Sequence, residues 1–183
     1  MLIFSAITPH PPILIPNIGK DNLNQILKTK QAMEQLGEEL YALQPDIIIV
    51  ISPHGLVHPY FFTVQMSKKY YGDFQTFGDL DDKFEFDSDI IFINKIKVRA
   101  ELKNLPIKLI NEPSLDHGTL VPLYYLTKNL PKVKIVPLAY SFLDYPDHFA
   151  FGKYLKKTIG RSNKRIALIA SGDLSHSLTT DAP

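Results

Sequence analysis

The sequence predicts an α/β fold of three layers, with a mainly parallel sheet that helices cover on both faces. Two observations support this prediction. Short runs rich in β-branched residues alternate with longer segments of helical periodicity. The run at 47–51 is apolar throughout, which is typical of a strand buried on both faces. A length of 183 residues fits one domain, 1–183.

The first half of the chain contains three predicted strands and one predicted helix. Residues 2–8 form a strand that the prolines around His10 bring to an end. Apolar residues at helical spacing predict a helix over 21–43, and strands follow at 47–51 and 61–66. The segment 68–87 is rich in glycine, aspartate and aromatic residues, so we expect a long functional loop there.

The second half continues the alternation of helices and strands. Many β-branched residues make 88–102 ambiguous, and we favour a helix. The remaining predicted elements are a strand at 107–110, a helix at 116–128, a strand at 133–141, a helix at 146–159 and a strand at 165–170. Because no helix follows the last strand, we expect the C-terminal part of the domain to be missing. The last strand should then carry poorly covered apolar surface.

Composition excludes several classes of function. The chain contains twenty basic and nineteen acidic residues. The resulting net charge of +1 argues against nucleic acid or an acidic membrane as the main partner. No apolar run reaches the roughly 18 residues that span a bilayer. The absence of cysteine excludes disulfides, thiolate nucleophiles and cysteine-based zinc sites. The apolar N-terminus lacks a basic start and contains four prolines, unlike a signal peptide, so a cytoplasmic location is expected.

Three of the six histidines directly follow predicted strands: His10, His54 and His176. In open α/β sheets ligands bind outside the carboxyl ends of the strands, so these three side chains can converge on one volume. Imidazole binds iron, zinc and copper, and a metal site is the simplest interpretation. The alternative is that each is an ordinary loop or core histidine, and their shared placement favours the metal site.

Two aspartates accompany candidate histidines. Asp116 precedes His117 at the start of a predicted helix, where it can simply cap the helix beside a surface histidine. Asp173 precedes His176 by three residues and can either hold the imidazole in one tautomer or cap the next turn. Two further histidines receive no role in the site. His58 is interpreted as an exposed loop residue, and His148 lies early in a predicted helix.

Four segments together resemble the class III extradiol ring-cleavage dioxygenases of the catalytic-subunit, LigB-like type. They read Thr-Pro-His-Pro-Pro at 8–12, Ser-Pro-His-Gly at 52–55, Asp-His-Gly at 116–118 and Ser-Gly-Asp-Leu-Ser-His at 171–176. They occur in the order that the family shows and extend over nearly the whole chain. Memo-type proteins share this scaffold. No esterase elbow, phosphate-binding loop or zinc-protease helix motif competes with the resemblance.

The resemblance implies a non-haem Fe(II) site in which His10 and His54 are the two histidine ligands. Its implied substrates are a catechol-type aromatic diol and O2. His176 is similar to the acid–base histidine of the family, which takes a proton from the diol and later returns one. His117 is similar to the second active-site histidine, which hydrogen-bonds substrate or oxygen.

The family's third metal ligand lies well downstream of the last matching segment, whereas this sequence ends at Pro183. Glu112 and Asp173 do not match the pattern of that ligand, so we expect a truncated chain. Two alternatives stay open: a Memo-like metal-binding or scaffold protein without ring cleavage, and a zinc-dependent enzyme on the same scaffold. A homo-oligomer is expected by analogy alone.

Overall fold

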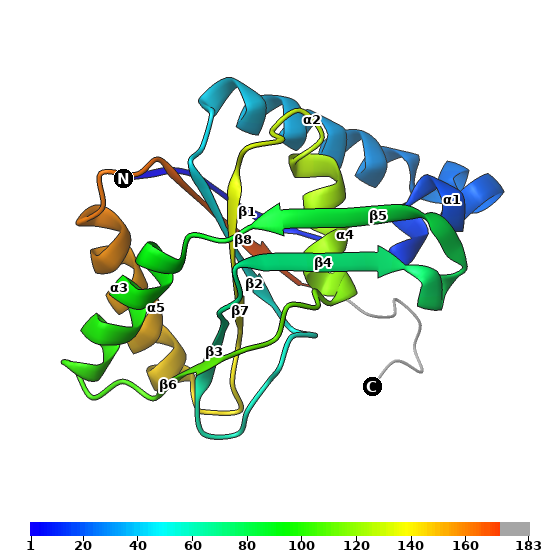
Figure 1. The fold of residues 1–183 in the computed structure, drawn as a ribbon. Coiled ribbons are helices and arrows are strands. Elements are labelled where there is room, and N and C mark those ends of the chain that lie inside the picture. Colours follow the sequence, from blue (N-terminus) through cyan, green and yellow to red (C-terminus); the bar gives the residue numbers. More distant parts are fainter. Residues whose placement is uncertain (173–183) are drawn as a thin grey trace.

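The computed structural model describes residues 1–172, within which six strands form one sheet in the order β1-β8-β2-β7-β3-β6 (Figure 1). These strands are β1 (Leu2–Thr8), β8 (Ile166–Ser171), β2 (Ile47–Ser52), β7 (Lys134–Ala139), β3 (Phe62–Gln65) and β6 (Ile107–Ile110). The first four are parallel neighbours, which confirms the predicted α/β class with a mainly parallel sheet.

Two strands reverse the direction of the sheet. β3 is antiparallel to β7, and β6 is parallel to β3. The segment 53–61 that joins β2 to β3 contains no helix. A parallel neighbour needs a longer crossover, usually a helix, so the chain turns back and β3 runs the other way.

Helices cover both faces of the sheet. α2 (Leu27–Leu43) and α4 (His117–Leu126) pack on one face, and α3 (Ile90–Glu101) and α5 (Tyr145–Gly160) pack on the other (Figure 1). Along β2, Ile48 and Val50 join the first core, whereas Ile47 and Ile49 join the second. Side chains alternate across a strand, so an entirely apolar run is the expected sequence for a strand between two helical layers.

The helices agree with the predicted ranges to within about two residues, apart from the start of α2. The helix expected from residue 21 begins at Leu27, after the short α1 (Pro16–Gly19) and a 3₁₀ segment over Lys20–Ile26. The ambiguous segment 88–102 contains α3, whose N-cap Asp89 accepts a hydrogen bond from the backbone N–H of Phe92. This cap stabilises the helix despite its β-branched residues.

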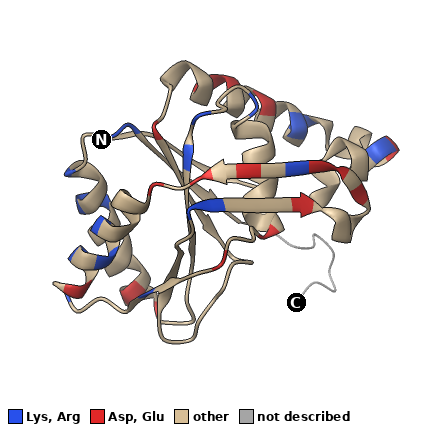
Figure 2. Cartoon of the chain, in the orientation of Figure 1, with Lys and Arg blue, Asp and Glu red and all other residues tan. Residues whose placement is uncertain are grey.

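The prediction of a long loop over 68–87 was wrong, because this segment is a β-hairpin. β4 (Lys69–Phe74) pairs antiparallel with β5 (Asp79–Asp87), and Gly78 adopts a positive φ of 90° in the connection. Phe84 and Phe86 pack against the α2–α4 core, while charged residues alternate with them along β5 (Figure 2). The many aspartates hid this period of two in a composition typical of loops.

The hairpin is fixed to the rest of the fold by buried polar contacts. The Tyr70 hydroxyl donates to the carbonyl oxygen of Gln65 at 2.8 Å, and burial raises the pKa of Tyr70 to about 12. Near the hairpin tip, Asn17 donates to Oδ1 of Asp79 at 3.2 Å. The connecting turn over Gln75–Phe77 therefore has a defined position beside α1.

Apolar surface remains at the β1 edge of the sheet rather than on β8 itself. Ile166, Ala167 and Ile169 of β8 are buried between β1 and β2, while Ile7 of β1 is 66% exposed. The expectation that the last strand carries poorly covered apolar surface was therefore wrong, because β8 lies inside the sheet and not at its edge. Over the described part of the chain, the helices are too short or too polar to cross a membrane.

Candidate metal centre

Three histidines meet at one edge of the sheet: His10, His54 and His117. One ring nitrogen from each lies within 4.8 Å of the other two. The Nε2 atoms of His10 and His54 are 3.1 Å apart, and the ring centroids of His54 and His117 are 4.2 Å apart. The structure therefore brings His10 and His54 together with His117, which the resemblance assigned to the same active site. His176 and Asp173 lie outside the described residues.

The order of the strands explains this convergence. β1 and β2 run parallel on either side of β8, so their carboxyl ends lie at the same edge. His10 and His54 each follow one of these ends, and His117 is the first residue of α4. This edge is where α/β proteins usually bind their ligands.

A buried serine at the end of β8 orients the ring of His10. The Ser171 hydroxyl donates to the carbonyl oxygen of Gly118 at 2.5 Å, and its oxygen lies 3.0 Å from Nδ1 of His10. A hydroxyl has one proton to donate, so Ser171 must accept the hydrogen bond from Nδ1–H of His10. In neutral imidazole this tautomer leaves the lone pair on Nε2, which points toward His54 and can bind a metal.

Asp116 joins the start of α4 to the end of β2. Its side chain accepts from the backbone N–H of Thr119 at 3.0 Å, which makes it the N-cap of the helix. It also accepts from the Ser52 hydroxyl at 2.5 Å, and Oγ of Ser52 accepts from the backbone N–H of His54 at 3.1 Å. Asp116 is therefore the predicted cap and also a residue that positions the segment carrying His54.

Gly118 allows these segments to approach closely. A Cβ atom at this position would lie 2.5 Å from Oγ of Ser52 and 3.1 Å from Cδ2 of His54. Both distances are shorter than normal van der Waals contacts, so any side chain would displace the groups that orient the site.

Replacing Gly118 with alanine should therefore weaken metal binding about 10–100-fold, as is usual when a group that orients a ligand is lost. Overpacking should also lower the free energy of unfolding by about 1–3 kcal/mol. A Zn²⁺ competition titration and urea unfolding measure the two effects. Gly152→Ala is the matched control, because a Cβ there meets nothing within 4 Å. Equal metal affinity in both variants would contradict the proposed packing constraint.

The three histidines differ in their access to solvent. His10 is only 3% exposed, His117 is half-buried and His54 is exposed. A cavity of about 340 Å³ adjoins His117, with the hairpin residues 71–73, 76 and 77 along one side. The Phe77 ring centroid lies 5.1 Å from that of His117. The volume lies at the lower end of the range of about 300–1,000 Å³ that is usual for small-molecule sites.

Glu112 lines a second cavity of about 270 Å³ that also contains His54. Its Oε1 accepts a hydrogen bond from the backbone N–H of Ser114 at 2.8 Å. The Gln65 side-chain amide donates to the backbone carbonyl oxygens of Glu112 and Ser114. Among the residues described, the group that could hold an ion contains the three histidines and not Glu112.

The other two described histidines lie apart from this cluster. Nδ1 of His58 accepts from the backbone N–H of Tyr60 at 3.1 Å, and its ring contacts that of Phe61. His148 lies against Phe62, with its Nδ1 2.8 Å from the carbonyl oxygen of Asp144. The structure thus leaves both outside the site, in agreement with the sequence.

Three residues beside the histidines were not predicted: Ser52, Ser171 and Phe77. Both serines end a strand inside a histidine motif, and a hydroxyl at that point is a signal that could have identified them. Phe77 gave no such signal, because its position depends on a β-hairpin whose sequence has the composition of a loop.

The cluster fits a divalent transition-metal ion. Ligands that bind one Zn²⁺ ion at about 2.0–2.1 Å lie roughly 3 Å apart, and the two Nε2 atoms are 3.1 Å apart. Three imidazole donors suit zinc, iron, copper or nickel rather than calcium or magnesium. The set includes His10, whose tautomer already presents a lone pair.

Replacing Ser171 with alanine removes the group that fixes this tautomer and also the hydrogen bond to Gly118. We expect metal affinity to fall about 10–100-fold while the fold persists. Isothermal titration with Zn²⁺ and circular dichroism measure this, with Ser5→Ala on β1 as the control for an exposed serine. Unchanged affinity in Ser171→Ala would show that Ser171 does not orient His10.

The sequence is similar to one protein family and to two individual proteins. Residues 5–183 match the family described as the catalytic LigB subunit of aromatic ring-opening dioxygenase. Protein CA_C1420 from Clostridium acetobutylicum is 30% identical over 184 aligned residues, which cover 96% of this chain. The MEMO1 family protein MJ0403 from Methanocaldococcus jannaschii is 37% identical over 65 residues, or 33% of this chain and 23% of that protein.

A solved structure shares the fold. The crystal structure of the uncharacterized protein JW3007 from Escherichia coli K12 covers 81% of this chain with a TM-score of 0.56 and 22% identity. The chain spans 54% of that structure and 39% of Protein CA_C1420.

Proposed function

Because the chain belongs to the LigB catalytic-subunit family of aromatic ring-opening dioxygenases, we propose that it is an Fe(II)-dependent extradiol dioxygenase. Its substrates are a catechol-type diol and O2. The observation that carries this proposal is the position of the paired His10 and His54 nitrogens in the cluster with His117, whose ring borders a cavity with an aromatic wall. Family membership supports the proposed reaction class, and the histidine cluster supports the proposed metal site.

In this proposal His10 and His54 hold the ion. Fe(II) held by these residues would supply the redox and Lewis-acid chemistry that lets an aromatic diol react with O2. Ser171 keeps Nε2 of His10 unprotonated, and the Asp116–Ser52 hydrogen bond positions the backbone of His54. The protein thereby orients the His10 ring and positions the segment that carries His54 before metal arrives.

His117 is assigned to the substrate rather than to the ion. Its ring lies between the other two histidines and Phe77 and borders the 340 Å³ cavity. From this position its ring N–H or lone pair can hydrogen-bond a diol oxygen. His176, which lies outside the described residues, is assigned the acid–base role, taking a proton from the diol and returning one later.

Phe77 should contribute to binding of the aromatic ring. Phe77→Ala removes the phenyl ring that contacts His117. Aromatic pairs contribute about 0.5–1.5 kcal/mol, so KM for catechol should rise roughly 2–10-fold. Steady-state kinetics at saturating Fe(II) measure the change, and metal affinity should stay constant. Phe149→Ala, an exposed aromatic on α5, is the control. An unchanged KM would remove Phe77 from the substrate site.

The function itself is tested by adding Fe(II) to the metal-free protein without oxygen and then mixing it with catechol and O2. The proposal expects oxygen uptake and ring-opened product in a ratio of one to one, both dependent on Fe(II). Mg²⁺ serves as the control ion, since imidazole donors do not suit it. Fe(II) binding without oxygen uptake across a panel of catechols would contradict the dioxygenase assignment.

Similarity to the MEMO1 family protein MJ0403 favours a second candidate, a metal-binding protein on this scaffold without ring cleavage. A cluster of imidazole donors also suits Zn²⁺. The same experiment separates the two candidates. Tight Zn²⁺ binding together with absent oxygen uptake in the Fe(II)-loaded protein would favour the second.

A further inference from the structure

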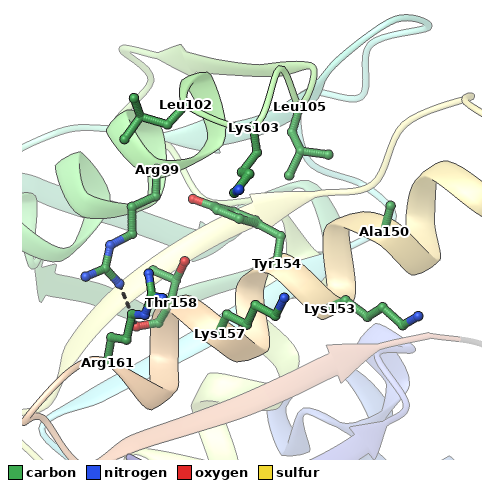
Figure 3. Close-up of a pocket in the computed structure, with 10 residues that line it drawn as sticks. All are labelled: Arg99, Leu102, Lys103, Leu105, Ala150, Lys153, Tyr154, Lys157, Thr158 and Arg161. Carbon is green, nitrogen blue, oxygen red and sulfur yellow. Dashed lines mark hydrogen bonds between the residues drawn. The ribbon is translucent and has the colours of Figure 1, made fainter.

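A cavity of about 420 Å³ lies between α3 and α5, in the helical layer opposite α2 and α4 (Figure 3). None of its ten lining residues is acidic, and half of them are cationic: Arg99, Lys103, Lys153, Lys157 and Arg161. It shares no residue with the histidine cluster or its cavities. Its charge therefore needs an explanation separate from the metal centre.

The charge is concentrated here although the chain as a whole is nearly neutral. The chain has a net charge of +1, yet five of its twenty basic residues line this one cavity. Lys and Arg are visibly frequent along α3 and α5 in Figure 2. Within residues 1–172 none of the five forms an ion pair with a carboxylate, whereas nearby Lys97 pairs with Glu101 at 3.3 Å. Like charges held together repel, and a bound anion would relieve that repulsion.

The interior of the cavity is apolar beneath this charged rim. The buried ring of Tyr154 on α5 and Leu105, which follows α3, contribute to it (Figure 3). The Tyr154 hydroxyl donates to the carbonyl oxygen of Ile96, and burial raises the pKa of Tyr154 above its usual 10. The tyrosine therefore stays neutral near pH 7 and adds no negative charge to the cavity.

The two arginines lie on the same side of the cavity (Figure 3). Arg99 reaches from α3 to donate to the carbonyl oxygen of Thr158 on α5 at 3.4 Å, and Figure 3 shows its guanidinium beside Arg161. Planar guanidinium groups bind phosphate through two parallel hydrogen bonds. The Lys153 ammonium instead lies 4.4 Å from the centroid of the Phe149 ring. Four cations thus remain for a ligand, which favours a phosphate of charge about −1.5 to −2 over a single carboxylate.

Helix ends account for part of this pattern only. Arg99 and Lys157 lie in the last turns of α3 and α5, where cations offset the partial negative charge of the helix C-terminus. That effect requires no cavity and no apolar surface between the two helices. The combination of an apolar interior and a cationic rim is what indicates a ligand.

We propose that the α3–α5 cavity binds a small phosphate monoester with an apolar or aromatic body. The body occupies the hollow at Leu105 and Tyr154, and the phosphate binds the guanidinium and ammonium groups at the rim. This site is independent of the proposed dioxygenase function, so either can fail without the other.

The probe for this proposal is 1-naphthyl phosphate, titrated against the metal-free chain by isothermal calorimetry. Saturable one-to-one binding is expected, with 1-naphthol and inorganic phosphate each binding at least tenfold more weakly. The double variant Arg99→Gln/Lys157→Gln should bind at least tenfold more weakly. The control Lys97→Gln/Lys156→Gln removes the same charge from the same helices outside the cavity, and should stay within twofold of the parent.

Three results would overturn the proposal: absence of saturable binding, equal weakening in both double variants, or inorganic phosphate binding as tightly as the ester. Thermal unfolding by circular dichroism establishes that both variants are folded. If Arg99→Gln/Lys157→Gln is not folded, Lys103→Gln/Arg161→Gln replaces it with the same expected tenfold loss.

Discussion

His10→Ala should abolish one-to-one binding of Fe(II) or Zn²⁺ at micromolar concentrations. His10 is buried, its tautomer is fixed by Ser171, and its Nε2 lies 3.1 Å from that of His54. Loss of an orienting partner typically costs about 10–100-fold in metal affinity, and loss of a ligand should cost more than about 100-fold. Equilibrium dialysis followed by metal analysis measures the stoichiometry directly.

The matched control for this variant is His58→Ala, because His58 lies outside the cluster and its Nδ1 bonds locally to Tyr60. This variant should bind metal as the parent does. Circular dichroism of both variants separates loss of the site from loss of the fold. If His10→Ala remains folded and binds one ion with parental affinity, the histidine cluster is not the metal centre.

His176→Phe should lower turnover about 10²–10⁴-fold, the usual contribution of a general acid–base group, while Fe(II) binding changes little. An imidazole with a pKa near 6.5 can both accept and donate a proton at neutral pH, and phenylalanine can do neither. Oxygen uptake at saturating Fe(II) and catechol gives the turnover, and dialysis gives the metal content.

His58→Phe is the control for introducing a phenyl ring at a histidine outside the site, and it should retain parental turnover. Loss of iron binding in His176→Phe would also be informative. If that variant loses iron as readily as His10→Ala does, His176 is a metal ligand and its assigned role is wrong.

The central strands could be predicted because their sequence pattern has one physical cause. The apolar run of β2 requires burial on both faces, and that requirement implies helices on each side of the sheet. Histidines placed just after β1 and β2 then had to lie at one edge. Asp116 was identifiable as a cap because a carboxylate before a helix accepts from its free N–H groups.

Features that depend on contacts distant in sequence could not be predicted. The hairpin β4–β5 is stabilised by packing of Phe84 and Phe86 on the α2–α4 core, which its aspartate-rich sequence does not reveal. Ser171 lies 161 positions from His10, so their hydrogen bond requires the order β1-β8-β2 to be known. The charges of the α3–α5 cavity likewise come from two helices that are separate in the sequence.

X-ray absorption at the iron edge, on the metal-free chain given one equivalent of Fe(II) without oxygen, tests the central proposal most directly. The proposed site predicts the multiple-scattering signature of at least two imidazole ligands, and the loss of that signature in His10→Ala. A coordination shell made of oxygen atoms alone in the parent chain would contradict a metal centre held by His10 and His54.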